Sequence, residues 1–176
     1  SGFINNIIKK QIIEKEFSIQ KNNININFKK IKLKKLSSHQ NIIYNKIIAK
    51  INKKQFKPIF LDGVTGSGKT EVYFKLIKYF LNKNKQVLVL IPEIALSKQW
   101  ITRFYEAFKF YPLVWNSKVN QSKKKKIWQD LIEGKINVVV GARSAIFLPF
   151  CKLGIIIIDE ENDISYKQEE SPIYNA

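Results

Sequence analysis

Apolar residues recur along this chain with two different periods, and each period predicts its own kind of element. In residues 40–52, 72–80 and 101–108 they fall three or four positions apart, which is typical of one face of a helix. A further, basic helix is expected over residues 121–133, stopping at Gly134. Short continuous runs of Val, Ile and Leu predict strands; they lie at residues 58–62, 87–91, 113–115, 138–140 and 155–158.

The order of these elements predicts the fold class. Strands that alternate with helices form crossover units and therefore a parallel sheet. Because the runs are continuous rather than alternating, we expect burial on both faces of the sheet. The chain is thus expected to be an α/β domain with helices on both faces of a mostly parallel sheet. In such sheets, ligands bind at the carboxyl ends of the strands.

The amino-terminal part of the chain follows a different pattern. Residues 3–20 have helical spacing followed by strand-like alternation, which is too little to bury a core. We expect residues 1–20 to be the end of another domain whose start is missing. Residues 21–36 are rich in Asn and Lys and are expected to be a linker, and residues 37–176 form the α/β domain.

Composition excludes several classes of protein. With 176 residues, 45% of them hydrophobic, the chain can bury a core and is not expected to be disordered. No apolar run approaches the roughly 18–20 residues that a membrane helix needs. The first residues show no secretory signal, and the absence of Met suggests a processed, truncated or engineered start. The single cysteine, Cys151, fits a reducing cytoplasm, and no membrane partner is expected.

The net charge of +17 permits two explanations. Basic excess suggests a polyanionic partner such as nucleic acid. However, the chain contains 29 Lys, 29 Ile and 16 Asn but only 2 Arg, which is also typical of an A/T-rich genome. The run of lysines at residues 123–126 is expected to be a solvated helix face rather than a DNA clamp.

Residues 63–70 match the P-loop pattern, between a predicted strand and a predicted helix. Glycines let backbone N–H groups surround phosphate oxygens, and the helix directs its positive end at the anion. Lys69 is expected to reach the β- and γ-phosphates, and Thr70 to hold Mg²⁺. ATP and Mg²⁺ are therefore the predicted cofactors. The complete predicted loop is Gly63, Val64, Thr65, Gly66, Ser67, Gly68, Lys69 and Thr70.

Two acids follow the strand at residues 155–158. In a P-loop enzyme, Asp159 would bind Mg²⁺ and Glu160 would orient and deprotonate the attacking water. The alternative interpretation is a polar turn after a buried strand. The P-loop elsewhere in the chain favours the catalytic interpretation.

Six segments, in order, resemble the PriA family of replication-restart helicases (primosomal protein N′). They are residues 63–73, 87–96, 141–147, 157–163, 165–168 and 172–174. The resemblance is strong over residues 37–176 and weak over 3–36. It implies the first RecA-like lobe of a superfamily-2, 3′-to-5′ DNA helicase that restarts stalled forks, with residues 3–20 ending a winged-helix domain. Forked and single-stranded DNA, other primosome proteins and single-strand DNA-binding protein are the implied partners, in the bacterial cytoplasm at the nucleoid.

The resemblance also implies roles for individual residues. Gln40 would pair with adenine, and Glu71 would belong to the nucleotide loop. The acidic box would be Asp159, Glu160, Glu161 and Asn162. The DNA contacts would be Pro92, Glu93, Arg143, Ser144, Tyr166 and Lys167. Simpler interpretations stay open: a solvated Gln40, an Arg143 that covers the sheet edge, and a Tyr166 that packs on its own domain.

This sequence also departs from the family pattern. Asn162, Asn116 and Asn175 stand where the family usually has His, and Ile173 stands where it usually has Arg. The second lobe, its arginine finger and the zinc-binding cysteines are absent from these residues, so zinc is expected only in the family's carboxyl-terminal part. Two alternatives follow: another superfamily-2 translocase, or a non-catalytic remnant of a decayed or split gene. We expect this chain alone to hydrolyse ATP slowly and not to unwind DNA.

Overall fold

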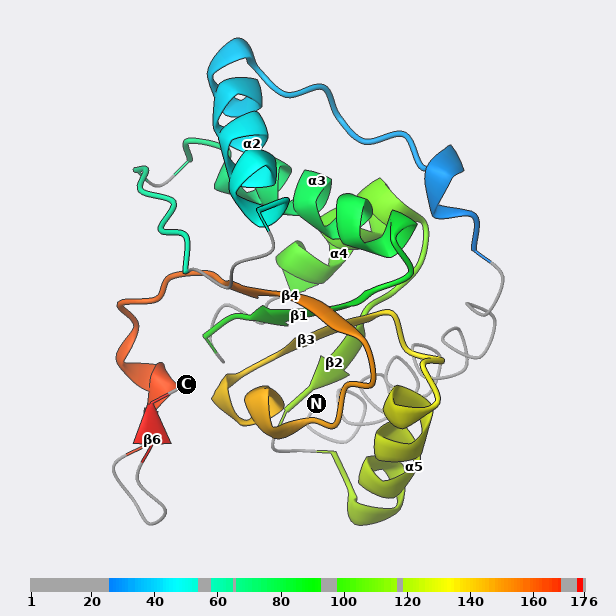
Figure 1. Cartoon of the computed structure of the whole chain (residues 1–176). Helices are drawn as coiled ribbons and strands as arrows, with labels where there is room; N and C mark the ends of the chain where they lie inside the picture. Colours follow the sequence, from blue (N-terminus) through cyan, green and yellow to red (C-terminus); the bar gives the residue numbers. More distant parts are fainter. Residues whose placement is uncertain are drawn as a thin grey trace, which may run out of the picture.

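The computed structural model describes residues 26–53, 58–64, 66–92, 98–116, 119–168 and 174–175. Their main sheet has the strand order β2-β3-β1-β4, and every neighbouring pair is parallel (Figure 1). The strands are β1 (Gln86–Leu90), β2 (Leu113–Trp115), β3 (Val138–Gly141) and β4 (Leu153–Ile158). A small antiparallel hairpin joins β5 (Lys167–Gln168) to β6 (Tyr174–Asn175). The predicted mostly parallel α/β sheet is confirmed.

Strand β1 lies inside the sheet and is enclosed from both faces. Val87 and Val89 belong to one hydrophobic core, whereas Leu88 and Leu90 belong to a second core across the sheet. All four side chains are 0% exposed. Because successive side chains point to opposite faces, only a continuous apolar run can bury such a strand.

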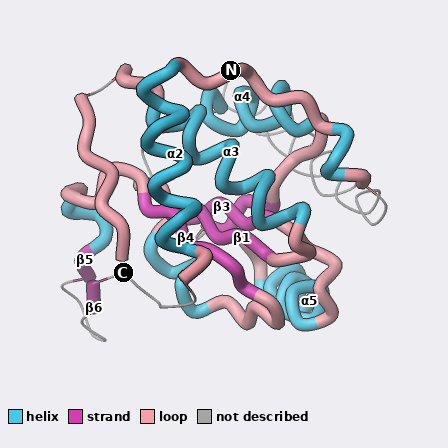
Figure 2. The backbone as a smooth tube through the Cα atoms, turned by 45° about the horizontal axis from the view of Figure 1, so that its top comes forward, coloured by secondary structure: helices cyan, strands magenta, loops and turns pink. Residues whose placement is uncertain are grey.

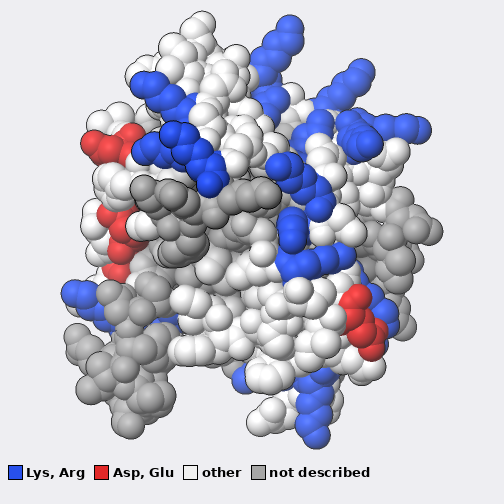
Figure 3. Space-filling view, in the orientation of Figure 1, with Lys and Arg blue, Asp and Glu red and all other residues white. Residues whose placement is uncertain are grey.

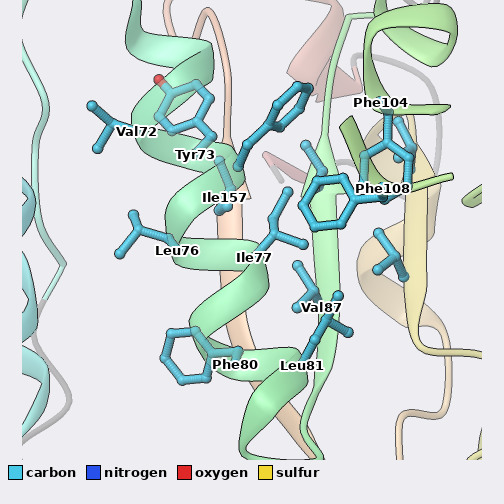
Figure 4. Close-up of a cluster of buried hydrophobic side chains, with 14 of the residues drawn as sticks. Val72, Tyr73, Leu76, Ile77, Phe80, Leu81, Val87, Phe104, Phe108 and Ile157 are labelled. Atoms are coloured by element: carbon cyan, nitrogen blue, oxygen red, sulfur yellow. The ribbon is translucent and has the colours of Figure 1, made fainter. Parts of the chain in front are cut away.

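Three helices cover the first face. Helices α3 (Lys69–Asn82) and α4 (Lys98–Phe108) line its core, and α2 (Ser38–Ile51) packs on the outside of α3 (Figure 2). Ile77 of α3 and Val87 of β1 lie close together within this core (Figure 4). Phe74 contacts the rings of Trp100, Phe104 and Phe108 edge-on, with centroids 5.6–5.9 Å apart. These helices match the predicted ones to within a few residues.

Helix α5 (Gln121–Ile132) and the 3₁₀ helix η3 (Arg143–Phe147) cover the second face. Ile127 and Leu131 of α5 and Ala145 of η3 pack against Leu88 and Leu90. The expectation of helical elements on both faces is therefore confirmed.

One expected strand is not formed, and a second is less buried than predicted. Residues 58–62 have no strand pairing, although Ile59 and Leu61 pack against the core on the α3 side and Phe60 is 71% exposed. Among the described residues, β4 is consequently an edge strand. Ile156 and Ile158 are 41% and 40% exposed, because nothing described covers that part of the second face. The prediction of burial on both faces is correct for β1 but wrong for β4.

The segment expected to be a linker packs on the domain over its described part, residues 26–36. It contains the 3₁₀ helix η2 (Phe28–Lys30), and Lys78 of α3 donates a 2.6 Å hydrogen bond to the Ile31 carbonyl. Five of its apolar residues pack against the α3-side core: Ile26, Phe28, Ile31, Leu33 and Leu36. The expected domain end at residues 1–20 lies outside the described residues, so that division stays a prediction.

A buried glutamine connects the start of β1 to neighbouring elements. Gln86 is 0% exposed. Its amide donates to the carbonyls of Leu131 and Ile136, at 3.1 and 2.8 Å, and accepts from the Lys152 N–H at 3.0 Å. It therefore links β1 to the end of α5 and to the start of β4.

Replacing this glutamine with leucine tests its contribution to stability. Gln86→Leu removes the amide partner of the Ile136 carbonyl and of the Lys152 N–H, whereas the Leu131 carbonyl keeps its bond from the Gly134 N–H. We expect the free energy of unfolding to fall by about 1–3 kcal/mol. Urea denaturation measures it, with Gln99→Leu on the exposed surface of α4 as the matched control. Equal stability of the two variants would contradict this role.

Candidate functional site

The sequence motifs gather at one edge of the sheet, where the parallel strands end. The P-loop leads into α3, the turn after β3 leads into η3, and the acidic residues follow β4 (Figure 1). This is the edge at which ligands of open parallel sheets bind.

The described part of the P-loop has the backbone of an anion cradle. Gly66 and Gly68 have φ angles of +81° and +82°, a conformation that favours glycine. Helix α3 begins at Lys69, and its N-cap, Gly68, supplies no side-chain hydrogen bond. A Cβ atom on Gly66 would meet nothing within 4 Å, so the space around it is open. The first N–H groups of α3 and the positive end of its dipole are therefore available to phosphate.

The Lys69 side chain extends across the P-loop. Its ammonium group donates a hydrogen bond to the Gly63 carbonyl at the other end of the motif. A Cβ atom on Gly63 would lie 2.9 Å from the Ser67 hydroxyl oxygen, which shows how closely the loop folds on itself. A triphosphate would have to replace the carbonyl as the partner of this ammonium group.

Gln40 reaches the P-loop from the first turn of α2. Its Nε2 donates to the carbonyls of Ser67 and Gly68, both at 3.3 Å. Its Oε1 accepts from the Ser37 N–H at 2.9 Å, as part of a capping box. Both ends of the amide are thus bonded within the domain, and pairing with adenine would require exchange of these bonds. A Cβ atom on Gly68 would lie 2.1 Å from Nε2, so a larger residue there would displace this amide, and the φ angle of +82° also favours glycine.

An ion pair that the sequence did not indicate supports the same loop. Glu71, in the first turn of α3, accepts from the Arg103 guanidinium of α4 at 2.8 Å. The pair ties α4 to the helix that carries Lys69 and Thr70. No local spacing predicts it, because the partners lie 32 positions apart on different helices.

Asp159 extends the hydrogen bonding of β4 toward α3. Its N–H donates to the Leu90 carbonyl at 3.0 Å, and its Oδ1 lies 3.4 Å from the Tyr73 hydroxyl. Thr70 precedes Tyr73 by three positions and so shares its face of α3. The structure thereby brings Asp159 toward the helix face that carries Thr70. This donor set suits Mg²⁺, which binds through one or two protein oxygens together with phosphate and water.

Within the described ranges, no group of three or more His, Cys, Asp or Glu side chains is arranged to hold a metal.

The next residue, Glu160, has a left-handed backbone. Its φ angle is +53°, and its carbonyl accepts from the Asp163 N–H at 2.8 Å to close the turn. Non-glycine residues held in this conformation store strain and are concentrated at functional sites. Glu161 and Asn162 continue the turn, and all three side chains are exposed.

Tyr166 is buried beneath this turn. It is 2% exposed, and its hydroxyl donates to the Asp159 carbonyl at 2.7 Å. It ends the 3₁₀ helix η4 (Ile164–Tyr166). The structure thus places Tyr166 within its own domain, and stacking on a base would require this loop to open.

Arg143 bonds the loop that contains Tyr166. Its guanidinium donates to the carbonyls of Ser165, at 3.4 Å, and Lys167. The side chain of Lys167 is exposed, and so is that of Ser144, whose hydroxyl accepts from the Trp115 indole N–H at 3.2 Å. Arg143 is therefore bonded to the loop after η4, while Ser144 and Lys167 present polar groups to solvent.

The remaining predicted site residues are placed as follows. Pro92 is buried after β1, Val64 is exposed in the P-loop, and Thr65 and Glu93 lie outside the described residues. None of the described helices is both long enough and apolar enough to cross a membrane.

The parallel sheet, the uncapped glycine loop and the acid after β4 define a P-loop motor domain of the helicase type. Residues 33–174 match the family described as "Type III restriction enzyme, res subunit". The chain belongs to this family, which confirms the RecA-like fold and the superfamily-2 helicase class.

Relatives that match this chain include proteins named "Replication restart protein PriA". The protein from Rickettsia conorii is 48% identical over 97% of this chain and 25% of its own length. The one from Rickettsia felis is 56% identical over 68% of this chain and 18% of its own length, and the one from Bacillus subtilis is 43% identical over 85% and 18%. The chain thus spans a quarter or less of these relatives, and the expected resemblance to PriA is confirmed.

The two tyrosines around Asp159 predict a dependence of stability on pH. Burial, followed by the Asp159 carboxylate, raises the pKa of Tyr73 and Tyr166 far above the ordinary value of 10.0. Below that value both phenols are protonated in the folded and unfolded states. At higher pH the unfolded chain releases protons that the folded state retains, so the free energy of unfolding should fall as the pH rises above about 10.

Urea denaturation at about pH 8 and about pH 11 measures this loss. The Tyr73→Phe/Tyr166→Phe variant should lose less stability between the two values than the parent does, because it lacks both phenols. Tyr105→Phe/Tyr111→Phe, on exposed and half-exposed rings, is the matched control. An equal pH dependence in all three proteins would show that the phenols near Asp159 do not contribute.

Proposed function

We propose that this chain is the ATP-binding motor lobe of a 3′-to-5′ DNA helicase that acts in replication restart. The observation that supports this most directly is the uncapped amino terminus of α3 with Asp159 held toward its first turns. A site for a nucleoside triphosphate requires three parts: N–H groups that bind anions, a lysine and a metal-binding acid.

In the proposed site, the amides of Gly66 to Thr70 surround the phosphates and the Lys69 ammonium neutralises their charge. The Thr70 hydroxyl and Asp159 hold Mg²⁺, the latter through water, and the metal would supply charge stabilisation to the phosphates. Gln40 and Glu71 keep the loop in place from α2 and α3, through the bonds to Ser67, Gly68 and Arg103 described above.

In this proposal Glu160 orients the attacking water and accepts its proton. Its side chain is exposed next to Asp159, the proposed metal-binding acid. The left-handed backbone of Glu160 sets the direction in which this side chain leaves the turn. Both arginines of the sequence are engaged elsewhere: Arg103 with Glu71, and Arg143 with the loop after η4. An arginine on the γ-phosphate contributes roughly 10³–10⁵ in rate in other P-loop enzymes, so hydrolysis by this chain alone should be slow.

The DNA contacts are proposed for the same edge of the sheet. Exposed groups on Ser144 and Lys167 can bind phosphates without reading sequence. Arg143 and Tyr166 act there on the loop that connects this edge to Asp159. Pro92 and Glu93, which follow β1 in the sequence, complete the proposed contact set.

The name of these relatives supports the biological setting. Forked and single-stranded DNA, primosome proteins and single-strand DNA-binding protein are proposed as partners, and ATP hydrolysis in the bacterial cytoplasm at the nucleoid as the activity. The engaged arginines favour one alternative, a chain that binds ATP and DNA without turnover.

A pair of variants separates nucleotide binding from hydrolysis. Lys69→Ala removes the main counter-charge of the triphosphate, and we expect calorimetry with Mg²⁺ to show a severe loss of ATP affinity. Glu160→Gln should bind ATP as the parent does while losing whatever slow hydrolysis the parent has, because the amide cannot accept the proton.

Lys78→Ala, which changes a lysine further along α3, serves as the control for loss of charge. Equal ATP affinity of the Lys69→Ala variant and the parent would refute the P-loop assignment. Parent and Glu160→Gln chains that are equally inactive would support the non-catalytic alternative.

A further inference from the structure

Helix α5 presents an exposed surface of mixed character on its outer side. Its inner side is the buried pair Ile127 and Leu131. On the outer side Trp128 is 47% exposed and Ile132 57% exposed, and Lys125 is exposed as well. These three residues are separated by three and four positions, so they share one face of the helix. We call this face, together with Lys124 at its border, the α5 surface.

One indole connects the α5 surface to the proposed DNA edge. The Trp115 N–H donates to the Ser144 hydroxyl oxygen at 3.2 Å. The Lys124 ammonium lies 5.8 Å from the centroid of the same ring. Because Trp115 ends β2 and Ser144 follows β3, the first turns of α5 border the carboxyl edge of the sheet.

Charge is distributed unevenly along α5. Residues 123–126 are all lysines, and the first turn has no acid. The acids lie at the other end, where Lys135 pairs with Asp130 and Glu133. Figure 3 shows acidic side chains beside the carboxyl end of α5 and a basic one at its amino end. The positive charge is therefore concentrated at the end that adjoins Trp115 and Ser144, and the helix dipole adds to it.

We propose that the α5 surface is an outer part of a single-stranded DNA path that begins at Ser144. Lys124 and Lys125 contact phosphates, and Trp128 offers an exposed ring on which an unpaired base stacks. Single-stranded DNA fits better than a duplex because the bases of a duplex are already stacked on one another. The inference rests on the proposed function, since that function places DNA at the adjoining edge. From sequence alone these lysines suggested a solvated helix face. The assignment to DNA rests on Lys124, which lies over the Trp115 ring that also bonds Ser144.

Fluorescence anisotropy with labelled oligothymidylate, at several salt concentrations, tests the two lysines. The observed affinity of the parent should fall with salt as counterions are released. For Lys124→Ala/Lys125→Ala, the slope of log affinity against log salt should be shallower by about 1.4, since each phosphate contact on a single strand contributes about 0.7. Lys83→Ala/Lys85→Ala, at exposed positions at the opposite end of β1, is the control of equal charge. It should bind oligothymidylate more tightly than the α5 variant does.

A second variant tests the aromatic contact. Trp128→Ala should weaken binding about tenfold at one salt concentration, and Trp128→Phe should recover most of that loss, because a phenyl ring still stacks. Unchanged ATP affinity in each variant would show that the chain is folded and that its nucleotide site is intact.

The possible outcomes separate this proposal from the proposed function. If the parent does not bind oligothymidylate, both the DNA edge and the α5 surface are refuted. If the parent binds and the α5 variant keeps the full slope, the α5 surface alone is refuted and the function stands. If polyglutamate displaces the DNA and depends on the same lysines and Trp128 with higher affinity, the surface is one for an acidic protein and our proposal is wrong.

Discussion

The candidate site depends on the parallel pairing of β1 with β4. This pairing continues past the end of the strand, where the Asp159 N–H donates to the Leu90 carbonyl at 3.0 Å. Strand β1 cannot shift, because its side chains are enclosed by a separate core on each face. A one-residue slip would turn each core residue to the opposite face. The position of Asp159, the proposed metal-binding acid, relative to α3 is therefore set by the packing of the whole sheet.

Around that fixed acid, two tyrosines and an arginine connect the parts that a motor must coordinate. Tyr73 links Asp159 to the P-loop helix, and Tyr166 links it to the loop that Arg143 holds. The bonds of Lys69 and Gln40 within the P-loop must in part be exchanged when a triphosphate binds. Local rearrangement at the proposed phosphate site can thus reach the proposed DNA edge through contacts between neighbouring side chains.

The sequence predicted the helices, the parallel sheet and the nucleotide motifs because these depend on local periodicity and on fixed spacing. It could not predict features that arise when distant segments meet. The ion pair of Arg103 with Glu71 and the bonds of Gln40 to the P-loop join different elements and leave no local pattern. The exposure of Ile156 is of the same kind, because a strand's apolar run does not show which neighbours will cover it. The motif left open whether Tyr166 stacks on DNA or packs on its own domain, and its burial follows only from the turn after Asp159.

The central claim is that the loop before α3 and the turn after β4 form one nucleotide site. Amide hydrogen exchange of the intact chain, with and without ATP and Mg²⁺, tests it most directly. The account predicts slower exchange at residues 66–71 and at residues 159–163 together, and a loss of both effects in the Lys69→Ala variant. Protection confined to some other part of the chain, or none at either segment at saturating nucleotide, would contradict it.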